Sequence, residues 1–251
     1  MISLYFFVFI FGAVIGSFLN VVILRLNTGQ SIVFGQSKCF SCAKKLRWRE
    51  LLPVFSFLLL RGKCSACKTK ISWQYPIVEI TTGLLFLSIV NQSSIINYLN
   101  IIYLWTVFSF LIIIAVYDYR HQIIPNLFVW IFNILAFAGL FFNFGKFDLN
   151  GLLAGFVLFT FFALLWGISK SKWMGFGDAK LALGIGWLLG MARGAAAITL
   201  AFWIGAIAGL LLIYLNKNKY GLKSSVAFGP FMILGTIISF FWGEKIISFL
   251  F

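Results

Sequence analysis

Two of the six acidic residues stand where a carboxylate could do chemistry. Asp118 closes an apolar run, and Asp178 follows Gly175 and Gly177 in the sequence Gly-Phe-Gly-Asp. Two facing carboxylates suit peptide hydrolysis, because the ionised one takes a proton from water while the protonated one polarises the carbonyl group. The glycines have no side chains to block a substrate backbone and can adopt unusual φ/ψ angles. The residues alone leave open a structural role, with Asp178 capping a helix and Asp118 an interfacial charge beside Arg120.

All four cysteines lie in one polar stretch and form two Cys-x-x-Cys pairs, Cys39 with Cys42 and Cys64 with Cys67. Two such pairs hold Zn²⁺ because each pair chelates one side of a tetrahedron. The alternatives are two disulfides or unrelated thiols, and a reducing compartment disfavours disulfides. We therefore predict a structural zinc that folds the loop and has no open ligand position for catalysis.

The other acids are given simpler roles. Glu79 lies just inside an apolar segment, where we expect it to cap a helix or to pair with a basic residue of the polar stretch. Asp148 and Glu244 are interpreted as solvated charges in short turns near lysines. The single histidine, His121, has no neighbours in sequence that complete a metal site. The two aspartates and the four cysteines therefore remain the candidate functional groups.

The elements that position these groups must be membrane helices. The chain has 251 residues, of which 62% are hydrophobic and only 10% are charged. A typical soluble protein has about 25% charged residues, so this composition cannot cover a soluble surface. One span needs about 20 apolar residues, and eight spans use about 160. We predict an all-α polytopic bundle of about eight transmembrane helices, with one polar loop between the first and second spans.

Apolar segments predict where the spans lie. Residues 1–24 are interpreted as the first span and not as a cleavable signal peptide, because the apolar run is too long and lacks a positive leading region. Seven further segments lie at 77–91, 98–117, 126–144, 150–168, 179–192, 194–215 and 226–242. An unbroken helix over 181–215 would be about 52 Å long, far beyond a ~30 Å core. We therefore predict a tight turn at Arg193-Gly194.

The net charge of +14 predicts the topology. Lys and Arg concentrate in cytoplasmic loops of membrane proteins. With eight spans and the N-terminus outside, the inner side holds the ten Lys/Arg of residues 25–70 together with Arg120, Lys170, Lys172, Lys180, Lys217, Lys219 and Lys223. The outer side holds Lys146, Arg193 and Lys245. We therefore expect a cytoplasmic Cys loop, both termini outside, the lipid bilayer as partner and no nucleic acid.

Several motifs together resemble one family, the type IV prepilin peptidases, which are Gly-x-Gly-Asp membrane aspartic proteases. The resemblance covers nearly the whole chain. Its motifs are residues 16–21 with Arg25, the two Cys pairs, residues 60–64 and 71–79, Asp118 with Ile124-Pro125, residues 175–181, and residues 228–231. Two positions depart from the family pattern. Phe40 stands where the first Cys pair usually has proline, and Asn126 follows Pro125 where an acid is common.

The resemblance implies a function for each part of the chain. Asp118 and Asp178 would be the catalytic pair, with Gly175, Gly177 and Lys180 in the active-site loop. The enzyme would cleave the short basic leader of prepilins or pseudopilins at the cytoplasmic face of the bacterial plasma membrane, in service of pili, secretion or DNA uptake. Many members with the Cys loop also N-methylate the new N-terminus with S-adenosylmethionine.

The implied organisation is a first span at 1–24, a zinc-binding loop with all four cysteines at 25–76 associated with methyl transfer, and a peptidase region at 77–251. The oligomeric state stays open. Two other functions compete. A presenilin-like or signal-peptide-peptidase-like protease would use the same aspartates, but the Cys pairs and Phe228-Gly229-Pro230 favour the prepilin group. A cation-coupled transporter would use the aspartates as proton sites, yet the sequence has no clear internal repeat of the kind transporters carry.

Overall fold

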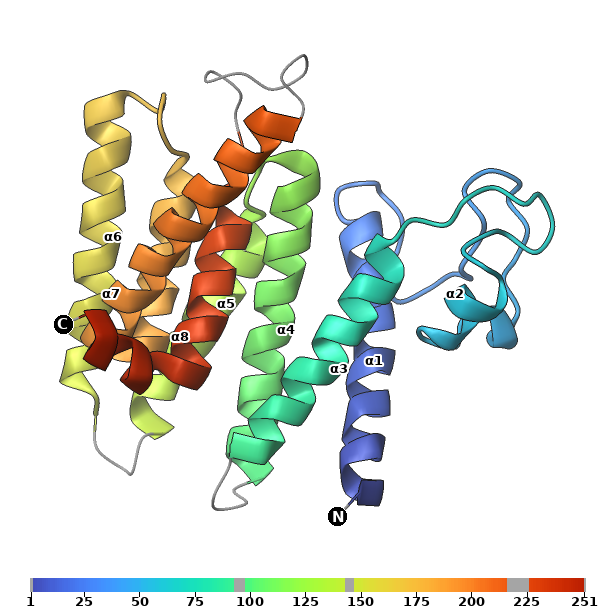
Figure 1. The fold of residues 1–251 in the computed structure, drawn as a ribbon, viewed down its shortest axis with the longest axis horizontal. Coiled ribbons are helices and arrows are strands. Elements are labelled where there is room, and N and C mark those ends of the chain that lie inside the picture. The colour runs from blue at the N-terminus through green and yellow to red at the C-terminus, as the bar shows by residue number, and fades with distance from the viewer. Residues whose placement is uncertain (1, 93–97, 143–146, 216–225, 251) are drawn as a thin grey trace. The chain divides into compact units, whose positions relative to one another are not determined.

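The computed structural model describes residues 2–92, 98–142, 147–215 and 226–250, and its regular elements are all helical. They are α1 (Ile2–Arg25), the 3-10 helix η1 (Trp48–Glu50), α2 (Phe55–Leu59), α3 (Gln74–Gln92), α4 (Tyr98–His121), α5 (Asn126–Phe142), α6 (Leu149–Ser169), α7 (Phe176–Leu215) and α8 (Gly229–Leu250) (Figure 1). The predicted all-α class is confirmed, with the four cysteines between α1 and α3.

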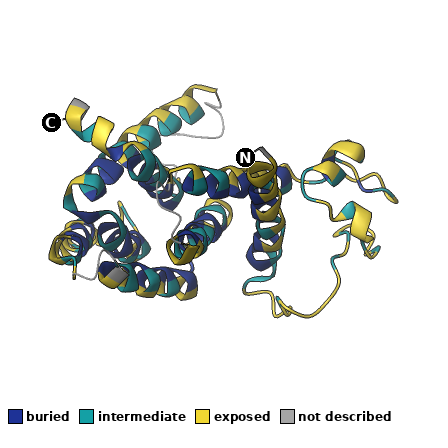
Figure 2. Cartoon of the chain, turned by 90° about the horizontal axis from the view of Figure 1, so that it is seen from below, coloured by how far each residue is buried: buried dark blue, intermediate teal, exposed yellow. Residues whose placement is uncertain are grey.

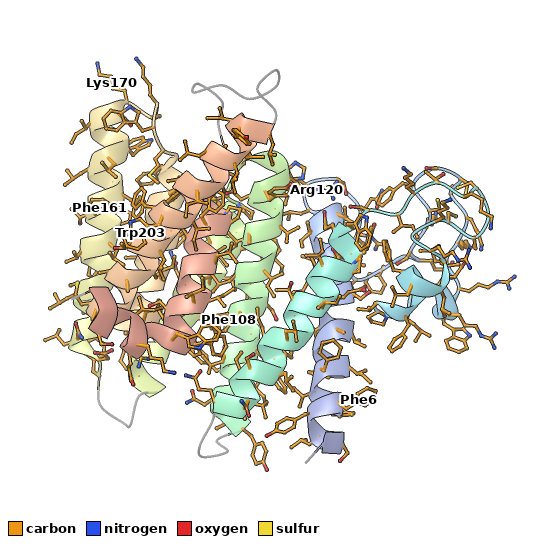
Figure 3. The ribbon with its side chains drawn as sticks, viewed as in Figure 1. Phe6, Phe108, Arg120, Phe161, Lys170 and Trp203 are labelled. Carbon is orange, nitrogen blue, oxygen red and sulfur yellow. The ribbon has the colours of Figure 1, made fainter. Side chains whose placement is uncertain are left out.

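Five of the described helices, α1, α4, α6, α7 and α8, are long and apolar enough to cross a membrane. α5 is apolar but shorter. Figure 2 shows exposed residues on the outward sides of the helices. Many of these exposed residues are large and apolar. Phe161 on α6 and Trp203 on α7 are 45% and 53% exposed (Figure 3). Such surfaces suit lipid and not water, in agreement with a polytopic membrane protein.

The chain divides into two compact units, Met1–Ile113 and Ile114–Phe251. In the first unit, α1 and α3 pack side by side in opposite directions. A Cβ atom on Gly12 would lie 2.8 Å from the Cα of Gly83, and one on Gly16 would lie 2.8 Å from the Cα of Glu79. The backbones approach this closely because glycine has no side chain at either place. The predicted functional division at residues 24/25 and 76/77 stays a prediction.

Glu79 joins the loop to this helix pair. The side chain is only 6% exposed, and its Oε2 accepts the backbone N–H of Val54 at 2.7 Å. Ser17 of α1 also hydrogen-bonds to this carboxylate. The expectation that Glu79 caps its own helix or pairs with a basic side chain is wrong, because its partner in the loop is a backbone amide. Val54 itself has φ of 62°, which is uncommon for a β-branched residue.

The second unit contains a reversal inside the long helix α7. Gly190 has φ 75° and ψ −177°, a conformation almost confined to glycine. A Cβ on Gly194 would lie 3.7 Å from the Cα of Gly186, although eight residues of one helix span about 12 Å. Two helices are therefore confirmed, but the predicted turn at Arg193-Gly194 is wrong. The break falls at Gly190, where only glycine tolerates the backbone angles.

Two predicted turn charges have structural partners. Asp148 caps α6 by accepting the backbone N–H of Gly151 at 3.0 Å. Glu244 lies within α8, not in a turn, and pairs with Arg193 at 2.8 Å. Asp148 therefore lies in the predicted connection but caps a helix, and Glu244 is solvated as predicted, with 86% of its side chain exposed, although the predicted turn location is wrong for it.

The structure describes some of the Lys and Arg residues that predict the topology. Arg120 and Lys170, both assigned to the inner side, lie toward the same end of the second unit (Figure 3). Four other lysines of that argument lie outside the described residues, namely Lys146, Lys217, Lys219 and Lys223.

Candidate active site and metal centre

Asp118 lies in the last turn of α4 and is buried, with 4% of its surface exposed. Its Oδ2 accepts the backbone N–H of Gly229 at 3.0 Å. Gly229 is the first residue of α8 and is followed by Pro230, which suits the first turn of a helix because an N–H there would have no partner within the helix. The start of the last helix therefore fixes one oxygen of this carboxyl group.

Asp178 is the third residue of α7 and is 7% exposed. Its Oδ2 accepts the backbone N–H of Gly175 at 3.1 Å, so the side chain closes the Gly-Phe-Gly-Asp turn and caps the helix. The capping role that the sequence left open is therefore present. It does not exclude a second role, because Asp178 is close enough to Asp118 for the two groups to interact electrostatically.

Ile124 marks the place where these segments meet. A Cβ atom on Gly177 would lie 2.9 Å from the Cβ of Ile124, and a Cβ on Gly229 would lie 3.5 Å from the Cδ1 of the same residue. The end of α4, the start of α7 and the start of α8 therefore converge on one point of the second unit. This arrangement brings the two predicted aspartates together although 60 residues separate them.

The two glycines of the turn serve different purposes. Gly177 is crowded by Ile124, whereas a Cβ on Gly175 would meet its nearest atom, Oδ2 of Asp178, at 3.6 Å, an ordinary contact. Neither glycine has the left-handed φ that favours this residue type, so the predicted unusual backbone angles are wrong in that respect. Close packing explains Gly177, and Gly175 leaves room beside the carboxyl group.

Lys180 lies at the edge of this site and joins two helices. Its Nζ donates to Oδ1 of Asn126 at 2.9 Å and lies 5.2 Å from the ring centroid of Phe176. Asn126 begins α5, so the contact ties the start of α5 to the start of α7. The departure from the family pattern at Asn126 therefore bears on Lys180. A role of Lys180 in substrate binding stays a prediction.

The sequence did not assign a role to Gly229. A backbone N–H carries no sequence signal, because every residue except proline has one. The available signal was the Gly-Pro pair directly before the last apolar segment. That pair marks a helix start, and helix starts present unpaired N–H groups to carboxylates.

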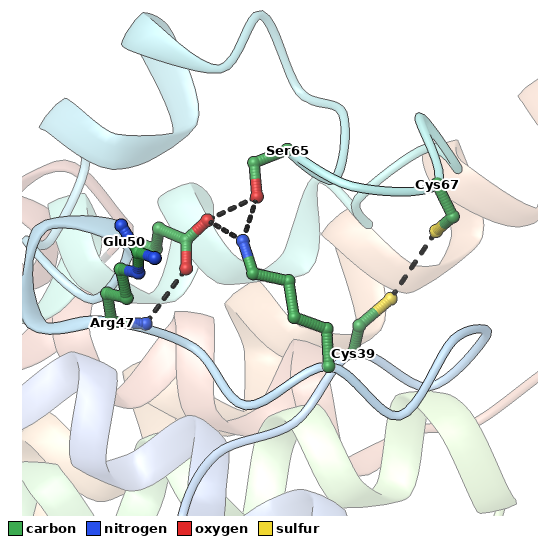
Figure 4. Close-up of polar contacts among 6 residues, drawn as sticks. Cys39, Arg47, Glu50, Ser65 and Cys67 are labelled. Atoms are coloured by element: carbon green, nitrogen blue, oxygen red, sulfur yellow. Dashed lines mark hydrogen bonds and ion pairs between the residues drawn. The ribbon is translucent and has the colours of Figure 1, made fainter.

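The four cysteines of the first unit form one cluster of free thiols. All four sulfur atoms lie within 4.8 Å of one another, and the Cys39 and Cys67 sulfurs are 3.8 Å apart (Figure 4). Four sulfurs bound to one Zn²⁺ at about 2.3 Å would be about 3.8 Å apart. The donor set and its spacing therefore fit a tetrahedral metal site.

The two Cys-x-x-Cys turns have the same backbone geometry. Cys39 and Cys64 each donate their backbone N–H to the carbonyl group five residues later at 2.9 Å. The residue after the second cysteine has left-handed φ in both turns, 55° at Ala43 and 60° at Lys68. Each turn thus presents its two sulfurs in the same way, and each supplies half of the cluster.

Glu50 holds the two turns together. Its Oε1 pairs with Lys44 of the first turn at 2.8 Å and accepts a hydrogen bond from Ser65 of the second turn (Figure 4). Its Oε2 accepts the backbone N–H of Arg47 at 2.8 Å. The Arg47 amide, Lys44 and Ser65 lower the pKa of Glu50 to about 2. The available sequence signal for this role was that Glu50 is the only acid among the ten Lys/Arg of residues 25–70.

The thiol pKa values diverge within the cluster. Backbone hydrogen bonds, above all from Cys42, lower the pKa of Cys39. Hydrogen bonds with Thr69 lower the pKa of Cys67 to about 6. A backbone hydrogen bond from Lys44 acts in the same direction at Cys42, but desolvation and hydrogen bonds with the three other thiols raise its pKa to about 11. Clustered thiolates repel one another, and a divalent cation removes that repulsion.

Comparisons with known proteins cover both sites. Residues 10–93 match the bacterial peptidase A24 N-terminal domain, and residues 105–214 match the type IV leader peptidase family. The first range contains the four cysteines and the second contains both aspartates. No solved structure matches the chain.

Three relatives are each named prepilin leader peptidase/N-methyltransferase. The protein of Bacillus subtilis (strain 168) is 33% identical over 242 residues, which cover 96% of this chain and 95% of the relative. That of Myxococcus xanthus (strain DK1622) is 33% identical over 82% of this chain and 62% of the relative. That of Pseudomonas aeruginosa is 28% identical over 94% of this chain and 89% of the relative.

Proposed function

Because this chain belongs to the type IV leader peptidase family, we propose that it hydrolyses the leader of prepilins or pseudopilins with Asp118 and Asp178 as the catalytic pair. The observation that carries the proposal is the convergence of two buried carboxyl groups at the starts of α7 and α8. Each carboxyl group is fixed through one oxygen by a backbone N–H, from Gly229 and from Gly175. Fixed, neighbouring carboxyl groups are the arrangement that aspartic proteolysis needs.

In the proposed mechanism the two aspartates share one proton. The ionised carboxylate takes a proton from water, and the resulting nucleophile attacks the scissile carbonyl carbon. The protonated carboxyl group polarises the carbonyl oxygen and then supplies a proton to the leaving amine. At the end the proton that the pair shares lies on the other carboxyl group, so the pair again holds one proton and turns over with water as the only co-reactant.

The proposed topology places this site at the cytoplasmic face. Asp118 and Asp178 lie at helix ends, and Arg120 and Lys180 are close to them in sequence. Cytoplasmic ends of spans are rich in such cations. A prepilin has a short basic leader before its apolar segment, so its scissile bond would reach the interface when the apolar part lies against the spans. The Cys loop is proposed to be cytoplasmic too, with the N-terminus outside.

We propose that Cys39, Cys42, Cys64 and Cys67 hold one Zn²⁺ in a structural site. With four sulfur ligands the ion has no open position, so it would fold the loop and not activate water. The names of the relatives support a second activity, N-methylation of the new N-terminus, for which S-adenosylmethionine supplies the methyl group.

One experiment tests both activities. The purified full chain is incubated with a purified prepilin and S-adenosylmethionine, and the product is weighed by mass spectrometry. We expect a mass loss equal to the leader and a mass gain of one methyl group. An unchanged prepilin mass with folded, zinc-loaded protein would contradict the peptidase proposal, whereas leader loss without methyl gain would contradict only the methyl transfer.

Gly229→Ala should reduce cleavage because the new methyl group would lie 2.6 Å from Oδ2 of Asp118. The carboxyl group must move, and a displacement of about 1 Å at a reacting group costs roughly 100-fold in rate. The measurement is the initial rate of leader removal. Gly209→Ala is the matched control, since a Cβ there has no neighbour within 4 Å. Normal cleavage by Gly229→Ala would show that this contact does not position Asp118.

The two proposed activities should be separable. When a loop that is folded by its metal loses that metal, the loop unfolds while the helices that carry the aspartates stay folded. Because methyl transfer is assigned to the loop, Cys64→Ser should reduce methylation more than cleavage. Asp178→Asn should lose cleavage but still methylate a pilin that has been cleaved beforehand. Both are followed by product mass. If Cys64→Ser reduced both activities in parallel, the loop would instead control substrate entry, and the two-site interpretation would be wrong.

A further inference from the structure

Exposed apolar side chains gather on α2 in the first unit. Phe55, Leu58 and Leu59 are 59%, 64% and 78% exposed, and Trp73, just before α3, is 69% exposed. Exposure of these apolar side chains to water would be unfavourable for so short a helix. Contiguous apolar surface of this kind marks contact with a membrane or a partner.

The packing of α1 on α3 gives the position of α2 along these two helices. Val54 directly precedes α2 and is bound to Glu79 of α3 at 2.7 Å. Glu79 lies against Gly16 of α1, and Gly16 is nine residues, or about 13 Å, before Arg25 at the end of that span. The hydrocarbon core is about 30 Å thick. α2 therefore lies alongside α1 and α3, within the length of this helix pair and not beyond its ends, as Figure 1 shows.

A pocket of about 400 Å³ adjoins α2. Its apolar wall includes Phe57 and Trp73, whose ring centroids are 4.9 Å apart. Its charged wall is formed by Arg61, Lys63 and Lys70. The pocket thus has an apolar side continuous with the exposed face of α2 and a side that carries three positive charges.

The positive charge of the pocket has no acid within the loop to balance it. The only acid among residues 25–70 is Glu50, and it is bound to Lys44 and Ser65. We infer that α2 and this pocket bind an anionic phospholipid of the bilayer. The acyl chains lie against the aromatic and leucine side chains, and the phosphate meets Arg61, Lys63 and Lys70. Long basic side chains reach a headgroup in this way while their stems stay in apolar surroundings.

Positively charged ligands fit this pocket poorly. A basic prepilin leader would be repelled by the three cations. S-adenosylmethionine is a net cation, because its sulfonium and ammonium charges outweigh its one carboxylate, and it has no acyl chain for the apolar wall. An anionic lipid satisfies both walls at once, and the bilayer around the apolar helices supplies it.

Retained lipid provides the test. The full chain is reconstituted in an equal mixture of phosphatidylglycerol and phosphatidylcholine, transferred to mild detergent, and weighed intact with its bound lipids. We expect wild type to retain phosphatidylglycerol in preference to phosphatidylcholine. Arg61→Gln with Lys70→Gln should lower that preference roughly tenfold or more. Lys45→Gln with Arg49→Gln is the matched control, with the same charge change on exposed side chains of the same loop, and should keep the preference.

Zinc content and leader cleavage are measured on each variant, so a folding defect or a failure of the proposed peptidase function is recognised separately. Three results would overturn the inference. These are equal retention of the two lipids by wild type, an equal loss in both double variants, and displacement of the lipid by inorganic phosphate or S-adenosylmethionine. The second would reduce the effect to the overall charge of the loop, and the third would remove the acyl chains from recognition.

Discussion

Replacing either catalytic candidate by its amide, as Asp118→Asn or Asp178→Asn, is expected to lower the rate of leader cleavage by roughly 10²–10⁴-fold. The amide oxygen can still accept the backbone N–H that each carboxylate accepts now, from Gly229 and from Gly175. The helix starts should therefore stay in place. What the amide cannot do is exchange a proton with water or with the leaving amine.

Asp148→Asn is the matched control for both variants. Asp148 caps α6 through Gly151, and asparagine caps helices about as well as aspartate. The control should keep the wild-type cleavage rate. Thermal unfolding of all three variants in detergent should occur near the wild-type temperature. Near-normal cleavage by one aspartate variant would remove that residue from the mechanism.

Zinc content should fall sharply when any of the four cysteines is replaced by serine. We expect one Zn²⁺ per chain in wild type, measured by elemental analysis of purified protein. Cys64→Ser should have the largest effect on the loop, because Cys64 is 5% exposed and the other three are not buried. The loop carries ten Lys/Arg, so faster cleavage by trypsin would report its unfolding.

Ser41→Ala is the control for these variants, since Ser41 lies between the first two cysteines and is not a thiol. It should retain one Zn²⁺. The same loop exposure should appear when wild type is treated with a strong chelator. Folded, active protein without zinc would contradict the metal assignment, as would the recovery of the four sulfurs in disulfide bonds.

The sequence by itself determined the class of fold and the candidate chemical groups. Low charge content requires a membrane protein, because a water-exposed surface cannot be built from so few charges. Two Cys-x-x-Cys pairs predict a metal cluster because the chelate is local: only two residues separate the cysteines of each pair, and the fold only has to bring the two pairs together. The sequence also predicted that the elements are helices, since helix formation depends on contiguous residues.

Tertiary structure alone decided how distant groups meet. The contact of Asp118 with Gly229 joins residues 111 positions apart through a backbone amide, and no side-chain pattern encodes such a partner. The reversal of α7 depends on which of several glycines takes the left-handed angle, and packing selected Gly190 in place of the charged neighbour Arg193. The position of α2 beside α3 follows from one hydrogen bond between Val54 and Glu79. Each of these features depends on contacts between segments that are distant in the sequence, and the spacing of residues along the chain does not predict such contacts.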